Sequence, residues 1–212
     1  MKQINKNKKF SLIELLTVLA ITGVILGISI PAFNTLLKGE SVEYASRTVL
    51  SMLKLARAYA ITNEVYSAVI IIMNETGLPT GFQYSAYRVA ELNSDLSFDK
   101  WIDGEKWEFL PTGASFIPKN LINSMTDNLS SITAVTDSPI GLNNAVDGIS
   151  PIGLNNAVDG IIFKPSGECE SNAKITIGSG TESGGVLIRT NSSNNVSLEV
   201  NRFTGRASYV DS

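Results

Sequence analysis

Glu14 is the only charged residue between Lys9 and Lys38, and the 23 residues that follow it, 15–37, are uncharged. As a helix that rises about 1.5 Å per residue, this stretch would extend over about 34 Å, enough to cross a bilayer core of about 30 Å. A carboxylate near the start of such a helix is costly in lipid, so it is expected to bind a cation or to reach the headgroups. The chemistry that Glu14 offers is therefore ion pairing.

Three interpretations compete for residues 1–37. A cleaved secretory signal would share the basic start, but its apolar core is shorter and ends at a small-x-small site. A plain membrane anchor would keep its basic end in the cytoplasm, with Lys2, Lys6, Lys8 and Lys9. The third interpretation makes Phe10 the N-terminus of a processed chain.

Residues 10–16, Phe-Ser-Leu-Ile-Glu-Leu-Leu, resemble the class III signal of type IV pilins and type II secretion pseudopilins. In that family a prepilin peptidase removes a short basic leader before a phenylalanine, and the new amine is N-methylated. The family's glutamate and proline correspond to Glu14 and Pro31. The resemblance therefore implies a leader at 1–9 and cleavage between Lys9 and Phe10. The family has Gly or Ala where this chain has Lys9, whose bulk and charge should impair the peptidase, and an uncleaved chain would remain a single-span anchor.

The resemblance also supplies a cation for Glu14. The α-amino group of a processed Phe10 would be positively charged near neutral pH and would lie one helical turn away. Pairing within a subunit, or with the amine of an adjacent subunit, would offset part of the burial cost and fix the axial register of packed helices. Pro31 lacks a backbone donor and should kink or locally melt the helix. Glu14 and Pro31 are thus the predicted assembly residues.

The composition argues against several classes of function. The chain has no histidine and a single cysteine, Cys169, so an intramolecular disulfide and Cys–His zinc sites are excluded and the commonest general base is missing. No nucleophile motif or phosphate-binding loop is recognisable, so an enzyme is not expected. Without the four lysines of the leader, 13 basic residues stand against 20 acidic ones, and this net charge of −7 opposes broad binding to nucleic acid.

The pattern predicts an α+β fold, and the resemblance makes it pilin-like, with a long N-terminal helix packed on antiparallel sheets. The helix would have a membrane half at 10–37 and a second half at 38–63 that ends at Asn63. An apolar stripe at helical spacing marks this second half: Val42, Ala45, Val49, Met52, Ala56 and Tyr59.

A β-rich domain is predicted at 64–212. Residues 65–73 and 82–92 should form an antiparallel hairpin, because β-branched and aromatic runs flank a turn region rich in Gly and Pro. Further strands are predicted at 106–110, 114–117, 160–164, 173–177, 186–190, 196–201 and 207–210. The segment 191–195 is predicted to be a turn between two of them.

Three short segments resemble the H-type minor pseudopilins and related minor pilins in particular. Residues 56–61 match an Ala-Arg-x-x-Ala-Ile at the end of the long helix, 163–167 resemble a Phe-x-x-x-Gly turn, and 204–206 resemble a C-terminal Thr-Gly-Arg. These matches favour a minor subunit.

A 12-residue unit, Ser-Pro-Ile-Gly-Leu-Asn-Asn-Ala-Val-Asp-Gly-Ile, occurs at 138–149 and again at 150–161. Two short copies rich in turn formers do not make a solenoid, and they indicate a duplicated insertion at 138–161. Asp137, Asp147 and Asp159 offer oxygen ligands for calcium, and major pseudopilins have a C-terminal calcium loop. No fixed ligand spacing is present, so no cofactor is expected.

With these features, the resemblance implies a structural subunit that assembles into the pseudopilus of a type II protein secretion system or into a type IV pilus. Its partners would be other pilin or pseudopilin subunits, the prepilin peptidase and membrane lipid. Before assembly it would cross the bacterial inner membrane once, with the C-terminal domain in the periplasm. Two alternatives remain open: an uncleaved anchored domain, and a DNA-binding minor pilin for DNA uptake if Arg189, Arg202 and Arg206 cluster.

Overall fold

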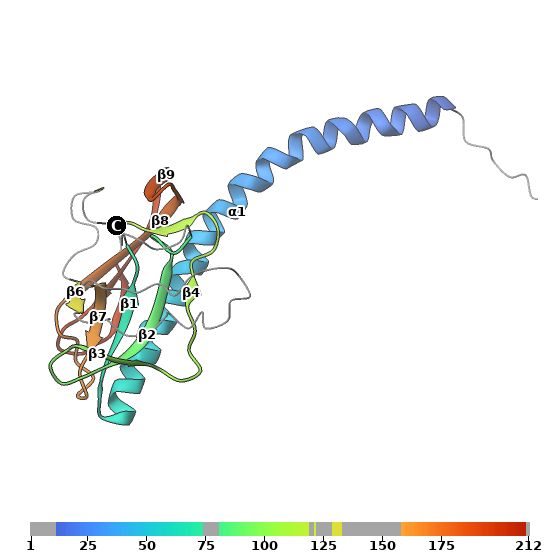
Figure 1. Ribbon diagram of the computed structural model, residues 1–212. Helices are drawn as coiled ribbons and strands as arrows, with labels where there is room; N and C mark the ends of the chain where they lie inside the picture. Colours follow the sequence, from blue (N-terminus) through green and yellow to red (C-terminus); the bar gives the residue numbers. More distant parts are fainter. Residues whose placement is uncertain (1–11, 74–80, 119–120, 122–128, 133–157, 211–212) are drawn as a thin grey trace, which may run out of the picture. The chain divides into compact units, whose positions relative to one another are not determined.

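The computed structural model describes residues 12–73, 81–118, 121, 129–132 and 158–210, without the side chains of 26–39. Contacts between Cα atoms divide the chain into two units, Met1–Leu37 and Lys38–Ser212, which are described separately. Helix α1 (Leu12–Asn63) contributes to both units, and ten described strands follow it in the second unit (Figure 1).

The second half of α1 packs through the predicted apolar stripe. Its members Val42, Ala45, Val49, Met52 and Ala56 are buried, and Tyr59 is partly buried against the same cluster. On the exposed side, Arg47 Nη2 lies 2.6 Å from Glu43 Oε1, as expected for oppositely charged residues one turn apart. The predicted end of the helix at Asn63 is also confirmed.

Sheet A is antiparallel and has the strand order β3-β2-β1-β7-β6, with β4 also paired to β2. The predicted hairpin is confirmed as β1 and β2, in which Tyr66 lies opposite Leu92. The sequence reasoning missed β3, whose two central charges hide the alternation of a strand, and it missed the three-residue β6. The strands of sheet A are β1 (Tyr66–Ile71), β2 (Ala86–Leu92), β3 (Phe98–Trp101), β4 (Glu108–Phe109), β6 (Ser130–Ile132) and β7 (Val158–Phe163).

Sheet B is antiparallel with the order β10-β9-β8-β5. Its strands are β5 (Ala114–Phe116), β8 (Ala173–Ser183), β9 (Val186–Val200) and β10 (Ala207–Val210). The chain reverses between β8 and β9 at Gly184 and Gly185, whose φ values of 61° and 81° suit a two-residue hairpin turn.

The predicted turn at 191–195 is wrong, because these residues lie inside the single strand β9. Asn191 is opposite Ser179 and Asn195 is opposite the adjacent Gly178, so the intervening residues bulge out of the ladder. Local bonds hold the bulge: Asn195 Nδ2 donates to the Ser192 carbonyl at 2.7 Å, and Asn194 Nδ2 donates to Ser179 Oγ at 2.8 Å. Residues 191–195 are turn formers, as the sequence indicates. Their preference for a loop is outweighed by these hydrogen bonds inside the sheet.

The main core lies where α1 meets residues of both sheets. It joins the helix stripe to Val69 and Phe163 of sheet A and to Ile177 and Leu198 of sheet B, all buried. A second buried cluster uses the alternate residues of sheet A, such as Ile70 and Ile162, and therefore lies on its other face. The structure thus confirms the predicted α+β class with antiparallel sheets.

Tyr87 in the main core sets an alkaline limit on stability. Burial raises the pKa of its phenol well above the usual 10.0, with a smaller contribution from the Glu108 carboxylate. Because the folded pKa lies above the unfolded one, this stabilisation is complete below about pH 10 and is lost as the pH rises toward the folded pKa. We expect urea unfolding of the detergent-solubilised chain to give a lower free energy at about pH 11 than at about pH 8.

Replacing Tyr87 with Phe should remove part of this alkaline loss. The matched control is Tyr209→Phe, because Tyr209 is 47% exposed. An equal alkaline loss in the wild type and in Tyr87→Phe would contradict the assignment.

Candidate assembly surfaces

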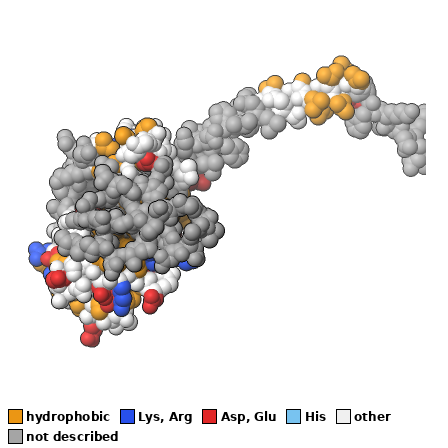
Figure 2. Space-filling model, viewed as in Figure 1, with side chains coloured by type: hydrophobic (Ala, Val, Ile, Leu, Met, Phe, Trp, Pro, Cys, Tyr) orange, Lys and Arg blue, Asp and Glu red, His pale blue; other side chains and the backbone are white. Residues whose placement is uncertain are grey.

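The described start of α1, residues 12–25, is apolar on every side. Nine large hydrophobic side chains in this segment are between 54% and 79% exposed, and their positions advance around the whole helix circumference: Leu12, Ile13, Leu15, Leu16, Val18, Leu19, Ile21, Val24 and Ile25. Figure 2 shows hydrophobic side chains on the visible face of this segment. A helix that is apolar all round is one that lipid or other helices cover. We call residues 12–25 the apolar segment.

The polar residues of the apolar segment are compatible with such surroundings. The Thr17 hydroxyl donates to the carbonyls of Ile13 at 2.9 Å and Glu14 at 3.0 Å, and the Thr22 hydroxyl donates to Val18 at 2.9 Å. These bonds satisfy both hydroxyl donors within the helix, so neither needs water. The exposed Glu14 is the one charged group of the segment.

The other predicted residues of this region are only partly described. Lys9 and Phe10 lie outside the described residues. The sequence predicts a kink or local melting of the helix at Pro31. α1 is helical through Pro31, so it does not melt there, and the Pro31 side chain lies outside the description. Within the described residues, no helix combines the length and the apolar character needed to cross a membrane.

The three short segments singled out in the sequence meet at one place in the second unit. Arg57 of α1 donates from Nε to the carbonyl of Gly167, after β7, at 2.9 Å. Gly205, between β9 and β10, has a φ of 60°, and a Cβ there would overlap the Gly167 carbonyl oxygen and lie 2.9 Å from Arg57 Nε. A Cβ on Gly167, where φ is 81°, would lie 2.7 Å from Ile61 Cδ1. Both glycines are therefore needed for two loops to close on this face of α1.

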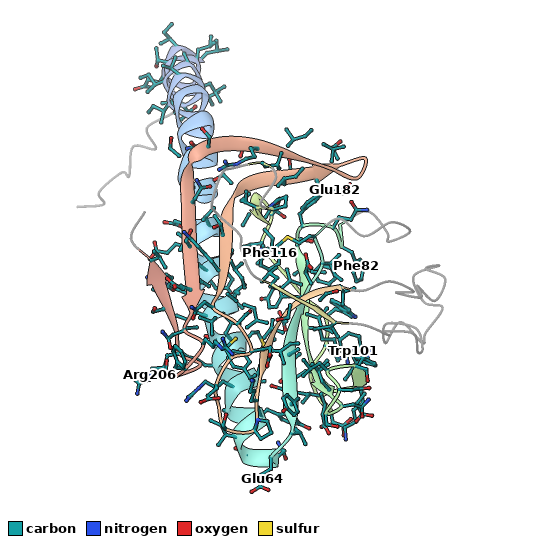
Figure 3. The ribbon with its side chains drawn as sticks, turned by 90° about the vertical axis from the view of Figure 1, so that its left-hand side faces the viewer. Glu64, Phe82, Trp101, Phe116, Glu182 and Arg206 are labelled. Carbon is teal, nitrogen blue, oxygen red and sulfur yellow. The ribbon has the colours of Figure 1, made fainter. Side chains whose placement is uncertain are left out.

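Beside this junction lies a pocket of about 470 Å³, which we call the basic groove. Lys54, Arg57 and Arg206 line it together with uncharged residues: Ala58, Ile61, Thr62, Gly205 and Ala207. Lys54 and Arg206 are exposed and Arg57 is half-buried, and no acidic residue lines the groove. Figure 3 shows Arg206 beside α1.

Sequence reasoning missed Lys54 and Arg57 as members of a charged site. The spacing of residues 54, 57, 58 and 61 could have indicated this site, because it places all four residues on one face of a helix. The cluster of Arg189, Arg202 and Arg206 that the DNA-binding alternative would need is not formed. Arg189 lies opposite Gly180 toward the β8–β9 turn, where its Nη2 donates to the Ser192 carbonyl at 3.1 Å, whereas the other two follow the far end of β9.

The structure brings no calcium site together in its described part. Asp137 and Asp147 lie outside that part, and Asp159 lies in β7 opposite Ile71 and Ser131. No group of three or more described His, Cys, Asp or Glu residues could hold a metal ion. Cys169 is buried, and this burial raises the pKa of its thiol.

No protein-family model and no curated protein sequence matches this chain. Solved structures do match. The minor pseudopilin EpsH of the Vibrio cholerae type 2 secretion system matches at 12% identity and a TM-score of 0.43, over 80% of this chain and 96% of that one. A second structure of EpsH matches at 11% identity and a TM-score of 0.42, over 81% and 94% of the two chains.

The type IV minor pilin FimU of Pseudomonas aeruginosa matches at 10% identity and a TM-score of 0.46, over 81% of this chain and 90% of that one. At these identities and scores the matches describe a likeness alone. The chain is thus similar to solved minor pseudopilin and minor pilin structures, the family that its N-terminal residues resemble.

Proposed function

We propose that this chain is a structural pilin or pseudopilin subunit that assembles through the apolar segment of α1. The observation that carries the proposal is the exposure of nine large apolar side chains around the whole helix. Covering one such side chain is worth about 1.5–3 kcal/mol relative to leaving it in water, so nine of them strongly favour a cover of lipid or of other helices. Lipid would cover this segment before assembly, and the helices of neighbouring subunits would cover it afterwards.

Glu14 gives this association a specific register. A carboxylate among apolar helices is stabilised when it pairs with a cation, and the α-amine of a processed Phe10 is a cation at the right helical distance. If the partner is the amine of a neighbouring subunit, only one axial offset between the helices satisfies the pair. In this proposal, close packing of the helices holds the subunits together, and the ion pair fixes the position of each subunit.

The proposed cellular place follows from the same segment. The lysines of residues 1–9 would remain in the cytoplasm by the positive-inside rule, and the second unit would lie in the periplasm. The subunit would leave the inner membrane when it joins a pseudopilus for protein secretion or a type IV pilus. A minor rather than a major subunit is favoured by the three short segments at 56–61, 163–167 and 204–206.

Mass spectrometry of the N-terminus of the native chain tests the proposal directly. We expect a product that begins at Phe10 and carries one methyl group on its amine. Because Lys9 departs from the small residue of the family, we expect Lys9→Gly to increase the processed fraction, whereas the control Lys6→Gly leaves it unchanged. A chain that still carries residues 1–9 in both the wild type and Lys9→Gly would contradict processing.

A further inference from the structure

The basic groove carries positive charge that the described fold does not neutralise. The described ion pairs are Arg47–Glu43, Lys100–Glu91 and Lys164–Glu170, and none of them uses a groove cation. Three like charges around one pocket raise its electrostatic free energy, and an anionic group placed among them would lower it. The groove walls Ala58, Ile61 and Ala207 are apolar, and Ile61 is 43% exposed. The groove therefore suits carboxylates that are carried beside an apolar side chain.

The same chain carries a surface with the opposite charge. Residues 95–109, which contain β3, β4 and the turn between them, hold two lysines and five acidic residues: Asp95, Asp99, Asp103, Glu105 and Glu108. β3 and β4 both pair with β2, so they lie along the outer edge of sheet A, and we call these residues the acidic edge. Lys100 is already paired with Glu91 at 3.5 Å, and Phe109 is 45% exposed beside Glu108.

One molecule cannot join its own groove to its own acidic edge. Arg57 faces the groove, whereas Tyr59 donates from its hydroxyl to Glu91 of β2 at 2.8 Å, next to the acidic edge. Two residues along a helix are rotated by about 200°, so the two surfaces lie on opposite sides of α1. Figure 3 agrees, because Arg206 appears on one side of α1 and Trp101 of β3 on the other.

We propose that the basic groove of one subunit binds the acidic edge of a second copy of this chain. The contact joins two different surfaces, so it is a head-to-tail contact between two copies. This inference rests on the proposed function, since the groove adds a second contact to subunits that the apolar segment already brings together. A polyanion such as DNA is the less suited occupant, because the surrounding chain has a net charge of −7 outside the leader.

Disulfide formation between two variants of the full chain tests this contact. Thr62→Cys places a thiol in the groove, and Lys106→Cys places one on the acidic edge, without removing a groove cation or an edge acid. The native Cys169 is 1% exposed and so is a poor competitor for oxidant. In mixed membranes we expect Thr62→Cys and Lys106→Cys to form a heterodimer, whereas the control Ser183→Cys, exposed at the β8–β9 turn away from the groove, does not pair with Lys106→Cys.

Reversing charges on the two surfaces then shows whether the heterodimer depends on electrostatic pairing or only on the two thiols being close together. We expect Arg206→Glu in the groove chain, or Asp103→Lys in the edge chain, to lower the heterodimer yield about tenfold, and the two together to restore most of it. Loss of yield in the single variants without recovery in the pair would overturn the proposed contact. Salt-dependent binding of single-stranded DNA that Arg206→Glu abolishes would also overturn it, because the groove would then be a nucleic-acid site.

A separate measurement shows which proposal has failed. Gly23→Cys reports on helix association, because a Cβ there would meet nothing within 4 Å. If Gly23→Cys dimers form and the groove–edge heterodimer does not, the contact between domains is wrong and assembly through α1 stands. If neither forms while the chain is processed at Phe10, the proposed function and this inference both fall.

Discussion

The Glu14→Gln chain is expected to be processed normally and to lose most of its incorporation into an assembly. The substitution keeps the size of the side chain and removes the charge that would pair with the amine of Phe10. A hydrogen bond to a charged group is worth about 1.5–3 kcal/mol, so we expect association to fall by about tenfold to a hundredfold. The measurement is the yield of Gly23→Cys dimers in membranes, read together with secretion or pilus output.

Two comparisons make this prediction specific. Glu43→Gln is the matched control, because Glu43 is an exposed carboxylate on the same helix whose partner, Arg47, lies within the domain. The effect of Glu14→Gln should also be small in a chain that still carries residues 1–9, since the α-amine of Phe10 does not exist there. Equal yields for the wild type and Glu14→Gln in the processed chain would refute the pairing role.

Gly205→Ala is expected to destabilise the second unit strongly, and more than Gly184→Ala does. The new Cβ would overlap the Gly167 carbonyl oxygen and crowd Arg57 Nε, and a φ of 60° is itself strained for alanine. Backbone strain of this kind costs about 1–3 kcal/mol, and the steric overlap adds to it, so we expect a loss of about 3–5 kcal/mol. Thermal or urea unfolding of the full chain measures this loss.

Gly184→Ala separates the cost of backbone strain from the cost of steric overlap. Gly184 has nearly the same φ, 61°, but a Cβ there would meet nothing within 4 Å. Its substitution should therefore show the backbone strain alone, about 1–2 kcal/mol. If both variants lose the same stability, the close approach of the two loops to Arg57 does not hold this junction together.

Features that depend on neighbouring residues could be predicted from the sequence. Short-range patterns indicate three of these features. They are the uncharged stretch around Glu14, the apolar stripe from Val42 to Ala56 and the end of α1 at Asn63. The β1–β2 hairpin could be predicted too, because its two strands and its turn region are adjacent in the sequence. The edge strands β3 and β6 were missed because short strands with polar residues leave no alternation to read.

The sequence by itself determined the part of the chain that is expected to act in assembly. A run of apolar residues with a single carboxylate is favoured in lipid or against other helices because of its own composition. This preference does not depend on how the rest of the chain folds. Only the tertiary structure decided that Lys54, Arg57 and Arg206 share one groove and that Arg189 lies elsewhere. That outcome depends on strand pairing, on the bulge in β9 and on two loops closing over glycines, and such long-range contacts are fixed by packing rather than by spacing along the chain.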